Sequence, residues 1–468
     1  MNRIFMSALR NPFWLLGFLC AGLYVLQPRL GETLVALRLF EAPPERIVSY
    51  LWSLLPLSLL YAGAVWLVLR PGEGRRVASL PLVIVLGLLF RLPLTAETPF
   101  LSSDIYRYLW DGRVQASGEV NPYLFSPADE ELAALRDDAI HPHINRKEAR
   151  TVYPAGAELL FGGAALVGLD TPGKFRAAGL LAEAVTLALL VLILGRLRLA
   201  QSRVLIYAWN PLVVFEAAQG GHVEVFMIPA VLAFVYLFLK GRVLGAGVAL
   251  GVAASIKLLP ALLVFALPRG KRLKVFLPLL VVVGLAYLPY AGAGGGIMGF
   301  LPAYFSDPYE IFNPGPIQKV LFWGSHLASA PVSWSRFVLA ALLLLILIPL
   351  ALRRESHTAD LVSKAYVAIG AYLVLIYPAF HPWYLCWIIP FVCLLSPMPP
   401  AWLYLSLVLP LSYLKYLAPG GAMPLWVPWV EFAPLYGLLA WEYFSMKPIH
   451  ERSSQWSLAS RAVSSTTL

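Results

Sequence analysis

Charged residues are scarce in this chain. Of its 468 residues only 13% are Asp, Glu, Lys or Arg, whereas 59% are hydrophobic, and the mean hydropathy is +0.72. A soluble domain of this composition could not cover its own apolar surface with polar side chains. The composition therefore excludes a soluble globular protein. It indicates a polytopic integral membrane protein, because many apolar runs approach the ~20 residues that cross a bilayer.

Cysteines are few, and nucleotide-binding motifs are lacking. Cys20, Cys386 and Cys393 lie in apolar runs and form no CxxC pair, which argues against a disulfide framework or a zinc site. No GxGxxG follows a strand and no Walker loop occurs, so no soluble nucleotide-binding fold is expected. His141 and His143 in "HPH" can chelate a metal, but a proline-interrupted pair is weak support. We therefore expect no metal and no other cofactor.

The apolar runs predict an all-α bundle of about 12–14 membrane spans, the lower figure applying if the two shortest runs do not cross the bilayer. The candidate spans are 12–27, 47–69, 78–95, 174–195, 203–219, 224–240, 243–256, 258–268, 274–290, 334–352, 365–380, 383–397, 401–415 and 430–446. Two of them, 243–256 and 258–268, are short and are expected to form a tight helical pair or a partly re-entrant segment. The apolar run 153–169 is placed at the outer interface, because counting it as a span would invert everything after it.

Basic residues indicate the orientation of the chain. The net charge is +10, and basic residues gather in alternate loops such as "GRLRLAQSR" and "PRGKRLK". Since Lys and Arg mark cytoplasmic loops, this charge reflects topology and predicts no binding to nucleic acid. The rule places both termini, including a tail at 447–468, in the cytoplasm of a cell (inner) membrane protein. The two longest polar loops, 96–152 and 291–333, are then periplasmic or extracellular. No polar block can fold alone, so 1–468 is expected to be one domain.

The first of these loops contains a charged, aromatic segment, "SSDIYRYLWDGRVQASGEVNPY" at 102–123. On a helix Asp104, Arg107, Tyr108 and Asp111 share one face, because their spacing is i, i+3, i+4 and i+7. The segment predicts an interfacial helix whose polar face points into a cavity. The alternative is a solvated helix whose charges pair with one another, with Asp104 serving only as a cap after two serines.

Other ionisable residues reach the same outer face in this topology. A charge at mid-bilayer costs roughly 2.5–3.5 kcal/mol on insertion scales, so such residues usually line a wet cavity or form pairs. The residues that suggest a shared site are Glu216, His222 and Glu224 in "FEAAQGGHVEVF", Lys257 in "AASIKLLP" and His381 in "HPWYLCWIIPF". For Arg91 and Lys415 we expect snorkelling toward the interface instead.

Together these residue types indicate group transfer from a lipid-linked phosphate to an alcohol. A carboxylate on a rigid helix can take a proton from a hydroxyl. Lysine and histidine at the membrane edge can hold a phosphate and stabilise charge on a leaving group. Aromatic residues can stack on sugar faces, although an interfacial aromatic belt explains any single one equally well. The aromatic residues in question are Tyr106, Tyr108, Trp110, Tyr123, Trp383 and Tyr384.

The ordered motifs resemble a known family. The segment at 102–123, then "IHPHINR", "TVYPAGAELLF", "YAWNPLVVFEAAQGGHVEVF", "AASIKLLP" and "HPWYLCWIIPF" are similar to those of GT-C membrane glycosyltransferases. The resemblance covers roughly residues 80–445, so 1–77 looks like an addition of N-terminal spans. It is strongest to bacterial polyprenol-phosphate-mannose-dependent mannosyltransferases, which are similar to glycosyltransferase family 87. It implies a polyprenyl-phosphate sugar donor, a glycolipid or glycan acceptor, and catalysis at the outer leaflet of the lipid bilayer.

The resemblance also implies roles for individual residues. Asp104 matches the carboxylate of the first outer loop, which would act as general base for direct displacement with inversion. Lys257 and His381 occupy stretches that hold the donor phosphate, with Arg107 as a helper. The residues expected to orient substrate are Tyr108, Asp111, Arg113, His222, Glu224, Trp383 and Tyr384. For Asp111 a structural bond to the following loop is the alternative.

Two further functions compete with this hypothesis. A transporter or flippase of lipid-linked sugars would show inverted repeats and paired broken helices, which the sequence lacks. A polysaccharide polymerase or ligase would rest on arginine-rich outer loops rather than on an early acidic helix. The sequence names neither the sugar nor the acceptor: mannose is the family default, while arabinose and glucose remain open.

Overall fold

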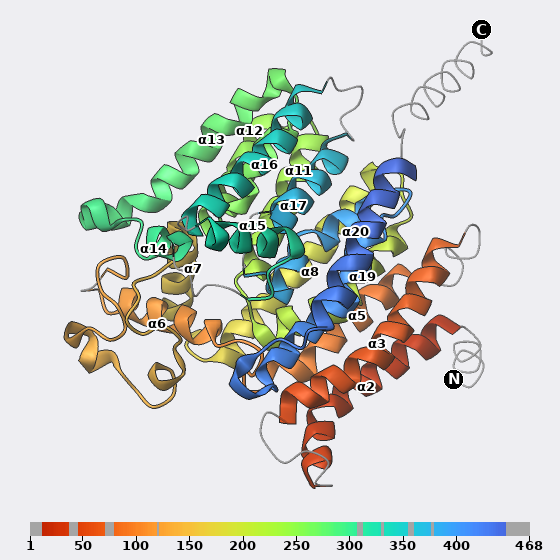
Figure 1. Cartoon of the computed structure of the whole chain (residues 1–468), viewed down its shortest axis with the longest axis horizontal. Coiled ribbons are helices and arrows are strands. Elements are labelled where there is room, and N and C mark those ends of the chain that lie inside the picture. Colours follow the sequence, from red (N-terminus) through yellow and green to blue (C-terminus); the bar gives the residue numbers. More distant parts are fainter. Residues whose placement is uncertain are drawn as a thin grey trace.

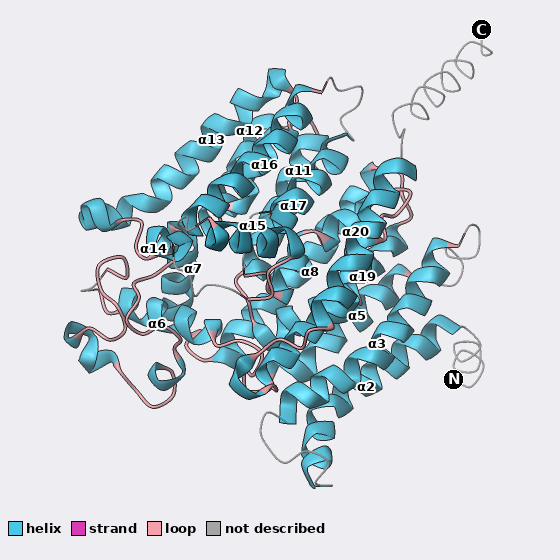
Figure 2. Cartoon of the chain, in the orientation of Figure 1, coloured by secondary structure: helices cyan, strands magenta, loops and turns pink. Residues whose placement is uncertain are grey.

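The computed structural model describes residues 12–36, 45–70, 79–118, 121–306, 312–328, 332–353, 360–375 and 379–445. Across these ranges the regular structure is helical, and the one β-type pairing is an isolated bridge between Phe312 and Ala379. Figure 2 shows a bundle of helices with its longest loops gathered at one end. The predicted all-α class is therefore confirmed. The predicted cytoplasmic tail at 447–468 lies outside the described residues.

Figure 1 labels the larger helices and colours the chain from red at the N-terminus to blue at the C-terminus. The α-helices are α2 (Pro12–Ala36), α3 (Glu45–Leu69), α5 (Leu80–Thr95), α6 (Asp104–Ala116), α7 (Ala155–Leu166), α8 (Pro172–Arg196), α9 (Leu205–Ala208), α10 (Pro211–Phe215), α11 (Glu224–Leu239), α12 (Val243–Ile256), α13 (Arg269–Tyr287), α14 (Leu301–Ser306), α15 (Pro316–Leu327), α16 (Val332–Leu352), α17 (Asp360–Leu375), α18 (Ile389–Leu394), α19 (Ala401–Val408) and α20 (Val427–Ser445). The 3₁₀ and π segments are η1 (Glu130–Leu135), η2 (His141–His143), η3 (Gln201–Val204), η4 (Glu216–Gly220), η5 (Leu259–Ala266), η6 (Leu288–Gly296), η7 (Pro382–Trp387), η8 (Leu409–Tyr416) and η9 (Pro419–Gly421).

Five helices of the described chain are long and apolar enough to cross a bilayer. They comprise Pro12–Leu30, Arg46–Leu69, Pro172–Arg196, Arg269–Gly296 and Trp334–Leu352. Several other expected spans are short or broken, as the tight pair at 243–268 illustrates with α12 followed by a 3₁₀ segment. The protein is a polytopic helical membrane protein, and the number of its spans stays a prediction.

The run predicted as one span at 203–219 is instead four short pieces, η3, α9, α10 and η4. Pro211 interrupts it, because proline lacks the N–H needed to continue a helix and restricts the residue before it. Asn210 starts α10 again by accepting a hydrogen bond from the backbone of Val213 at 3.3 Å. The second interruption is the π segment that ends in Gly220 and Gly221. This broken segment is mostly buried and carries Glu216, and His222 follows it directly after Gly221.

Arg91 does not snorkel, so that expectation is wrong. Its side chain is fully buried and forms an ion pair of 2.7 Å with Glu183, which is 1% exposed. It also donates to the carbonyl oxygens of Gly87 and Ala208, and the Tyr207 hydroxyl donates to Glu183 at 2.7 Å. The pair lies too deep in the bundle for its guanidinium to reach water, and facing helices supply its partners instead. This ion pair joins α5, α8 and α9.

α6 and α7 pack closely at the loop-rich end of the bundle (Figure 1). Gly112 makes this possible, since a Cβ there would lie 2.4 Å from the carbonyl oxygen of Phe161. The Tyr108 ring stacks on Phe161 with centroids 4.7 Å apart. The apolar run at 153–169 therefore forms a helix that supports α6 from behind. Its placement at a membrane interface stays a prediction.

Candidate active site

One large cavity lies where α6, the loop that follows it and the end of α12 meet η7 and α16. Its volume is about 1080 Å³, slightly above the roughly 300–1,000 Å³ typical of small-molecule sites. It therefore has room for more than one small substrate. Of the predicted site residues, those that line it are Asp104, Arg107, Lys257, His381, Trp383 and Tyr384.

Asp104 is the first residue of α6, and its side chain is 24% exposed. Asn145 donates to one carboxylate oxygen, Oδ1, at 3.1 Å, while the Nδ1 atom of His222 lies 3.8 Å from the other, Oδ2. Ser103 is the N-cap residue and makes no side-chain capping hydrogen bond, while the Ser102 hydroxyl accepts the backbone N–H of Asp104 at 3.2 Å. The carboxylate is thus held by side chains from distant segments and faces the cavity.

Arg107 and Asp111 form an ion pair one turn apart on α6. The Arg107 Nε atom lies 2.8 Å from both Asp111 oxygens, and its Nη1 donates to the carbonyl of Ala149 at 2.9 Å. Its Nη2 has no hydrogen-bond partner within the described ranges. Arg107 lines the cavity and can offer this nitrogen to an anion, whereas Asp111 lies behind it and fits the structural alternative.

A second carboxyl lies behind Asp111. Glu158 on α7 accepts hydrogen bonds from Thr151 at 2.5 Å and from Gln115 at 2.8 Å. Burial raises the pKa of Glu158 well above its usual range, and the nearby Asp111 raises it further. Burial also raises the pKa of Asp111, against the lowering influence of Arg107. A neutral Glu158 beside the Arg107–Asp111 pair leaves this buried cluster without net charge and ties α6 to α7.

Lys257 lies at the C-terminal end of α12, where the backbone becomes extended. Its Nζ atom is 3.1 Å from a Glu224 oxygen, and the two side chains are 18% and 2% exposed. The ammonium also lies 5.7 Å from the ring centroids of both Tyr153 and Tyr384. Glu224 holds the cation from behind, so the lysine presents it to the cavity.

Four rings form a continuous stack beside these charges. The ring centroids are 4.0 Å apart between His222 and Trp383, and 4.1 Å apart between Trp383 and His381. The centroids of His381 and Phe312 are 4.3 Å apart. Burial and the neighbouring His222 lower the pKa of His381 well below its ordinary value. The His381 Nδ1 atom has no hydrogen-bond partner in the part of the chain that the structure describes. His381 therefore enters the site as a neutral ring, which suits a hydrogen bond to a phosphate better than charge neutralisation.

Five of the predicted residues do not line the cavity. Asp111, His222 and Glu224 are buried directly behind cavity residues, as described above. Tyr108 is buried against α7. Arg113 points away, forming an ion pair of 2.7 Å with Asp137 in the same loop. None of these five side chains lines the cavity, and their predicted role in orienting substrate stays a prediction.

The sequence interpretation overlooked several cavity residues. They share a position in the loop after α6 or at the start of α16, and they are Asn145, Arg146, Arg150, Tyr153 and Arg336. The polar stretch "HINRKEAR" was a signal for the first three, but it mixes basic and acidic residues as an ordinary solvated loop does. Nothing local marked Arg336, because it precedes a long apolar run.

The described residues contain no group of three or more His, Cys, Asp or Glu side chains placed to hold a metal. In the "HPH" segment the His141 Nε2 atom lies 3.2 Å from the carbonyl oxygen of Pro127, while His143 stacks on Tyr106 at 4.8 Å. The two rings have different neighbours and form no chelating pair.

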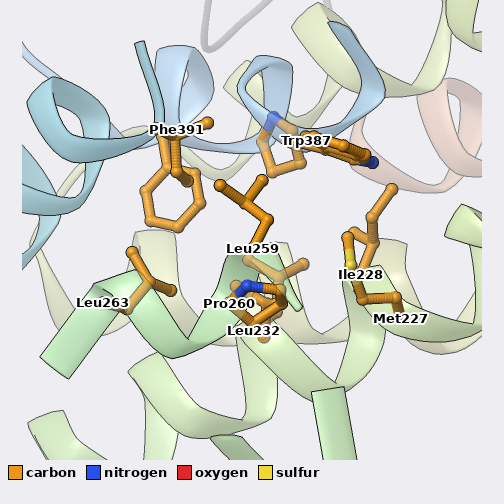
Figure 3. Close-up of a pocket in the computed structure, with 11 residues that line it drawn as sticks. Met227, Ile228, Leu232, Leu259, Pro260, Leu263, Trp387 and Phe391 are labelled. Atoms are coloured by element: carbon orange, nitrogen blue, oxygen red, sulfur yellow. The ribbon is translucent and has the colours of Figure 1, made fainter. Parts of the chain in front are cut away.

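A small apolar pocket adjoins the large cavity. It shares Leu259 and Trp387 with the cavity and is enclosed by apolar side chains of α11, η5 and α18 (Figure 3). It has room for only about 10 Å³, which is at the lower limit for one water and offers it few polar partners. It is a packing gap, so the charges of the large cavity are the chemically active surface.

Comparison with known proteins identifies the family. Residues 13–268 match the family model of the MptA_B family, described as alpha-(1->6)-mannopyranosyltransferase, N-terminal domain. The chain belongs to this family. The protein is therefore a membrane glycosyltransferase of a mannosyltransferase family, which uses a sugar donor and a glycan or lipid acceptor. No curated protein and no solved structure matches the chain.

The match bears on two predictions. It confirms the resemblance to membrane mannosyltransferases and favours the enzyme hypothesis over a transporter. It begins at residue 13 and so includes α2 and α3, which the resemblance over residues 80–445 had treated as an N-terminal addition. It ends at residue 268, before the segment that carries His381 and Trp383.

Proposed function

We propose that the protein transfers mannose from a polyprenyl-phosphate donor to a hydroxyl of a lipid or glycan acceptor, at the outer face of the membrane and with inversion. The observation that carries this proposal is the meeting of Asp104, Lys257 and His381 in one cavity, although they lie far apart in the sequence. A carboxylate facing two phosphate-binding groups across one space is what a single displacement requires.

The donor phosphate is assigned to the side of the cavity formed by Lys257, His381 and the Nη2 atom of Arg107. Lys257 supplies charge, and the other two supply nitrogens that have no hydrogen-bond partner among the described residues. Apolar side chains continue from this side along η5 and α16, and the lining includes Leu258, Leu259, Phe337 and Ala340. Leu258 and Phe337 are 45% and 74% exposed, so the apolar wall reaches the protein surface, where a lipid tail can leave the cavity.

The chemical step balances with the residues in place. The acceptor O–H gives its proton to the Asp104 carboxylate as its oxygen forms a bond to the anomeric carbon of the sugar. The bond between that carbon and the phosphate oxygen breaks, and the electron pair remains on the phosphate. Lys257 stabilises this charge, which increases on the leaving group in the transition state. Attack from the face opposite the phosphate inverts the anomeric centre.

The experiment is an assay of the purified enzyme with a panel of polyprenyl-phosphate sugars and mass analysis of the product. Asp104→Asn should lower the transfer rate by about 10²- to 10⁴-fold, the contribution of a positioned general base. Donor binding should survive, because the phosphate groups are untouched. Asp170→Asn is the matched control, since Asp170 is exposed and pairs with Lys174 one turn away at the surface. Transfer by Asp104→Asn at near the wild-type rate would overturn the assignment of the base.

A further inference from the structure

His222 lies between two carboxylates, out of reach of the cavity. Its side chain is 1% exposed, with Nδ1 lying 3.8 Å from Asp104 Oδ2 and Nε2 lying 3.4 Å from Glu216 Oε2. The Tyr413 hydroxyl donates to the other Glu216 oxygen at 2.9 Å. A buried line of polar groups thus runs from Tyr413 through Glu216 and His222 to Asp104, and only Asp104 meets the cavity.

The backbone around His222 is built to put the ring there. Glu216–Gly220 is a π segment, a rare local widening of the helix that often occurs at functional sites. A Cβ on Gly220 would lie 2.6 Å from the His222 ring. Gly221 has φ of +64°, and a Cβ on it would lie 2.8 Å from Ile105 on α6. Both glycines in "AAQGGH" are therefore needed to bring the imidazole against α6.

The surroundings place an acceptor beside each ring nitrogen of His222. Nδ1 faces an Asp104 oxygen and Nε2 faces a Glu216 oxygen, so the nitrogen that carries a proton can donate toward a carboxylate. The ring stacks on Trp383 with centroids 4.0 Å apart, which fixes the plane of the imidazole.

We propose that His222 is a positioning residue for Asp104, held by Glu216 and Tyr413. It fixes the carboxylate through Oδ2 and so directs Oδ1 toward the acceptor hydroxyl. The present separation of 3.8 Å from Nδ1 to Oδ2 shortens to a hydrogen bond when substrate fills the cavity, as catalytic contacts commonly do. This assignment rests on the proposed function and replaces the expected contact between His222 and substrate. A displacement of about 1 Å at a reacting group can cost about 10²-fold in rate.

Two substitutions test the roles of the two ring nitrogens of His222 independently. The amide of His222→Asn reaches the place of Nδ1 and can still donate to Asp104, whereas that of His222→Gln reaches the place of Nε2 and meets only Glu216. We expect kcat to fall about 10- to 100-fold in His222→Gln and clearly less in His222→Asn, with KM for donor and acceptor unchanged in both. His326→Ala is the control, since His326 lies on the exposed face of α15 far from this line of groups.

Each other outcome contradicts the proposal. A raised KM at constant kcat would mean that His222 binds substrate. Equal losses of kcat and Tm in the two variants would mean that the ring serves packing alone. If His222→Gln fails to fold, Glu216→Gln keeps the imidazole and should still lower kcat several-fold, and unchanged kcat there overturns the proposal. Loss of activity in Asp104→Asn with normal kcat in the His222 variants refutes this inference alone, whereas an active Asp104→Asn refutes the proposed function.

Discussion

Two ion pairs, each between a basic side chain and a buried glutamate, have different roles in this protein. Arg91–Glu183 is closed: the arginine is 0% exposed, and its nitrogens are satisfied by Glu183 and two backbone carbonyls. Lys257–Glu224 is open: the lysine is 18% exposed and lines the cavity, and Glu224 Oε2 has no hydrogen-bond partner among the described residues. In this chain, an ionisable residue therefore indicates a functional site where part of its hydrogen-bonding capacity is unused and the side chain is accessible from the cavity.

The closed pair offers the largest effect on stability. Arg91→Met leaves Glu183 buried without its cation, and removal of one partner of such a pair costs about 3–5 kcal/mol. We expect a large drop in Tm in detergent, with a corresponding loss of folded protein. The double variant Arg91→Met/Glu183→Leu should recover most of the stability, because no unpaired charge remains. An unchanged Tm in Arg91→Met would show that the two pairs do not differ in the way described.

The open pair should respond in activity instead. Lys257→Met should lower the transfer rate about 10²-fold, equivalent to about 2.7 kcal/mol of transition-state stabilisation. Its Tm should change less than that of Arg91→Met, since Lys257 is 18% exposed at the cavity whereas Arg91 is fully buried. Lys174→Met, at an exposed pair with Asp170, is the matched control for loss of a lysine. Full activity in Lys257→Met would remove this residue from the phosphate site.

A third carboxylate, Glu97, belongs to neither ion pair and is intermediate in burial. Glu97, in the segment before α6, is partly buried near Arg46 and Arg176, and burial raises its pKa to about 7. Its folded pKa exceeds that of the unfolded chain, so the folded state binds the extra proton. The stability that this provides is complete below the unfolded pKa near 4.5 and is lost as the pH rises through about 7. The effect should be the smallest of the three.

The measurement is Tm in detergent across this pH range. The wild type should lose stability relative to Glu97→Gln as the pH rises, because the glutamine cannot ionise. Parallel curves for the two proteins would show that Glu97 is already ionised in the folded state. Glu148→Gln, in the exposed part of the following loop, is a control for removal of a carboxylate alone.

Local periodicity explains which parts of the site were predictable. The spacing of Asp104, Arg107 and Asp111 puts them on one helical face, and that inference needs only 3.6 residues per turn. The length of an apolar run similarly predicts a helix, and the runs that became α3, α8 and α16 show it. The run at 203–219 misled, because Pro211 breaks it inside an otherwise apolar segment and the π segment Glu216–Gly220 ends it.

The sequence by itself determined the class of the protein, its helical architecture and the residue types of its chemistry, since these follow from composition and short-range pattern. Only the tertiary structure decided that Arg91 is paired while Lys257 is open, and that His222 lies behind Asp104 rather than in front of it. Such outcomes depend on residues far apart in the sequence: 92 positions separate Arg91 from Glu183, and 197 separate Glu216 from Tyr413. The packing of whole helices sets the distances between them, and no local pattern encodes those distances.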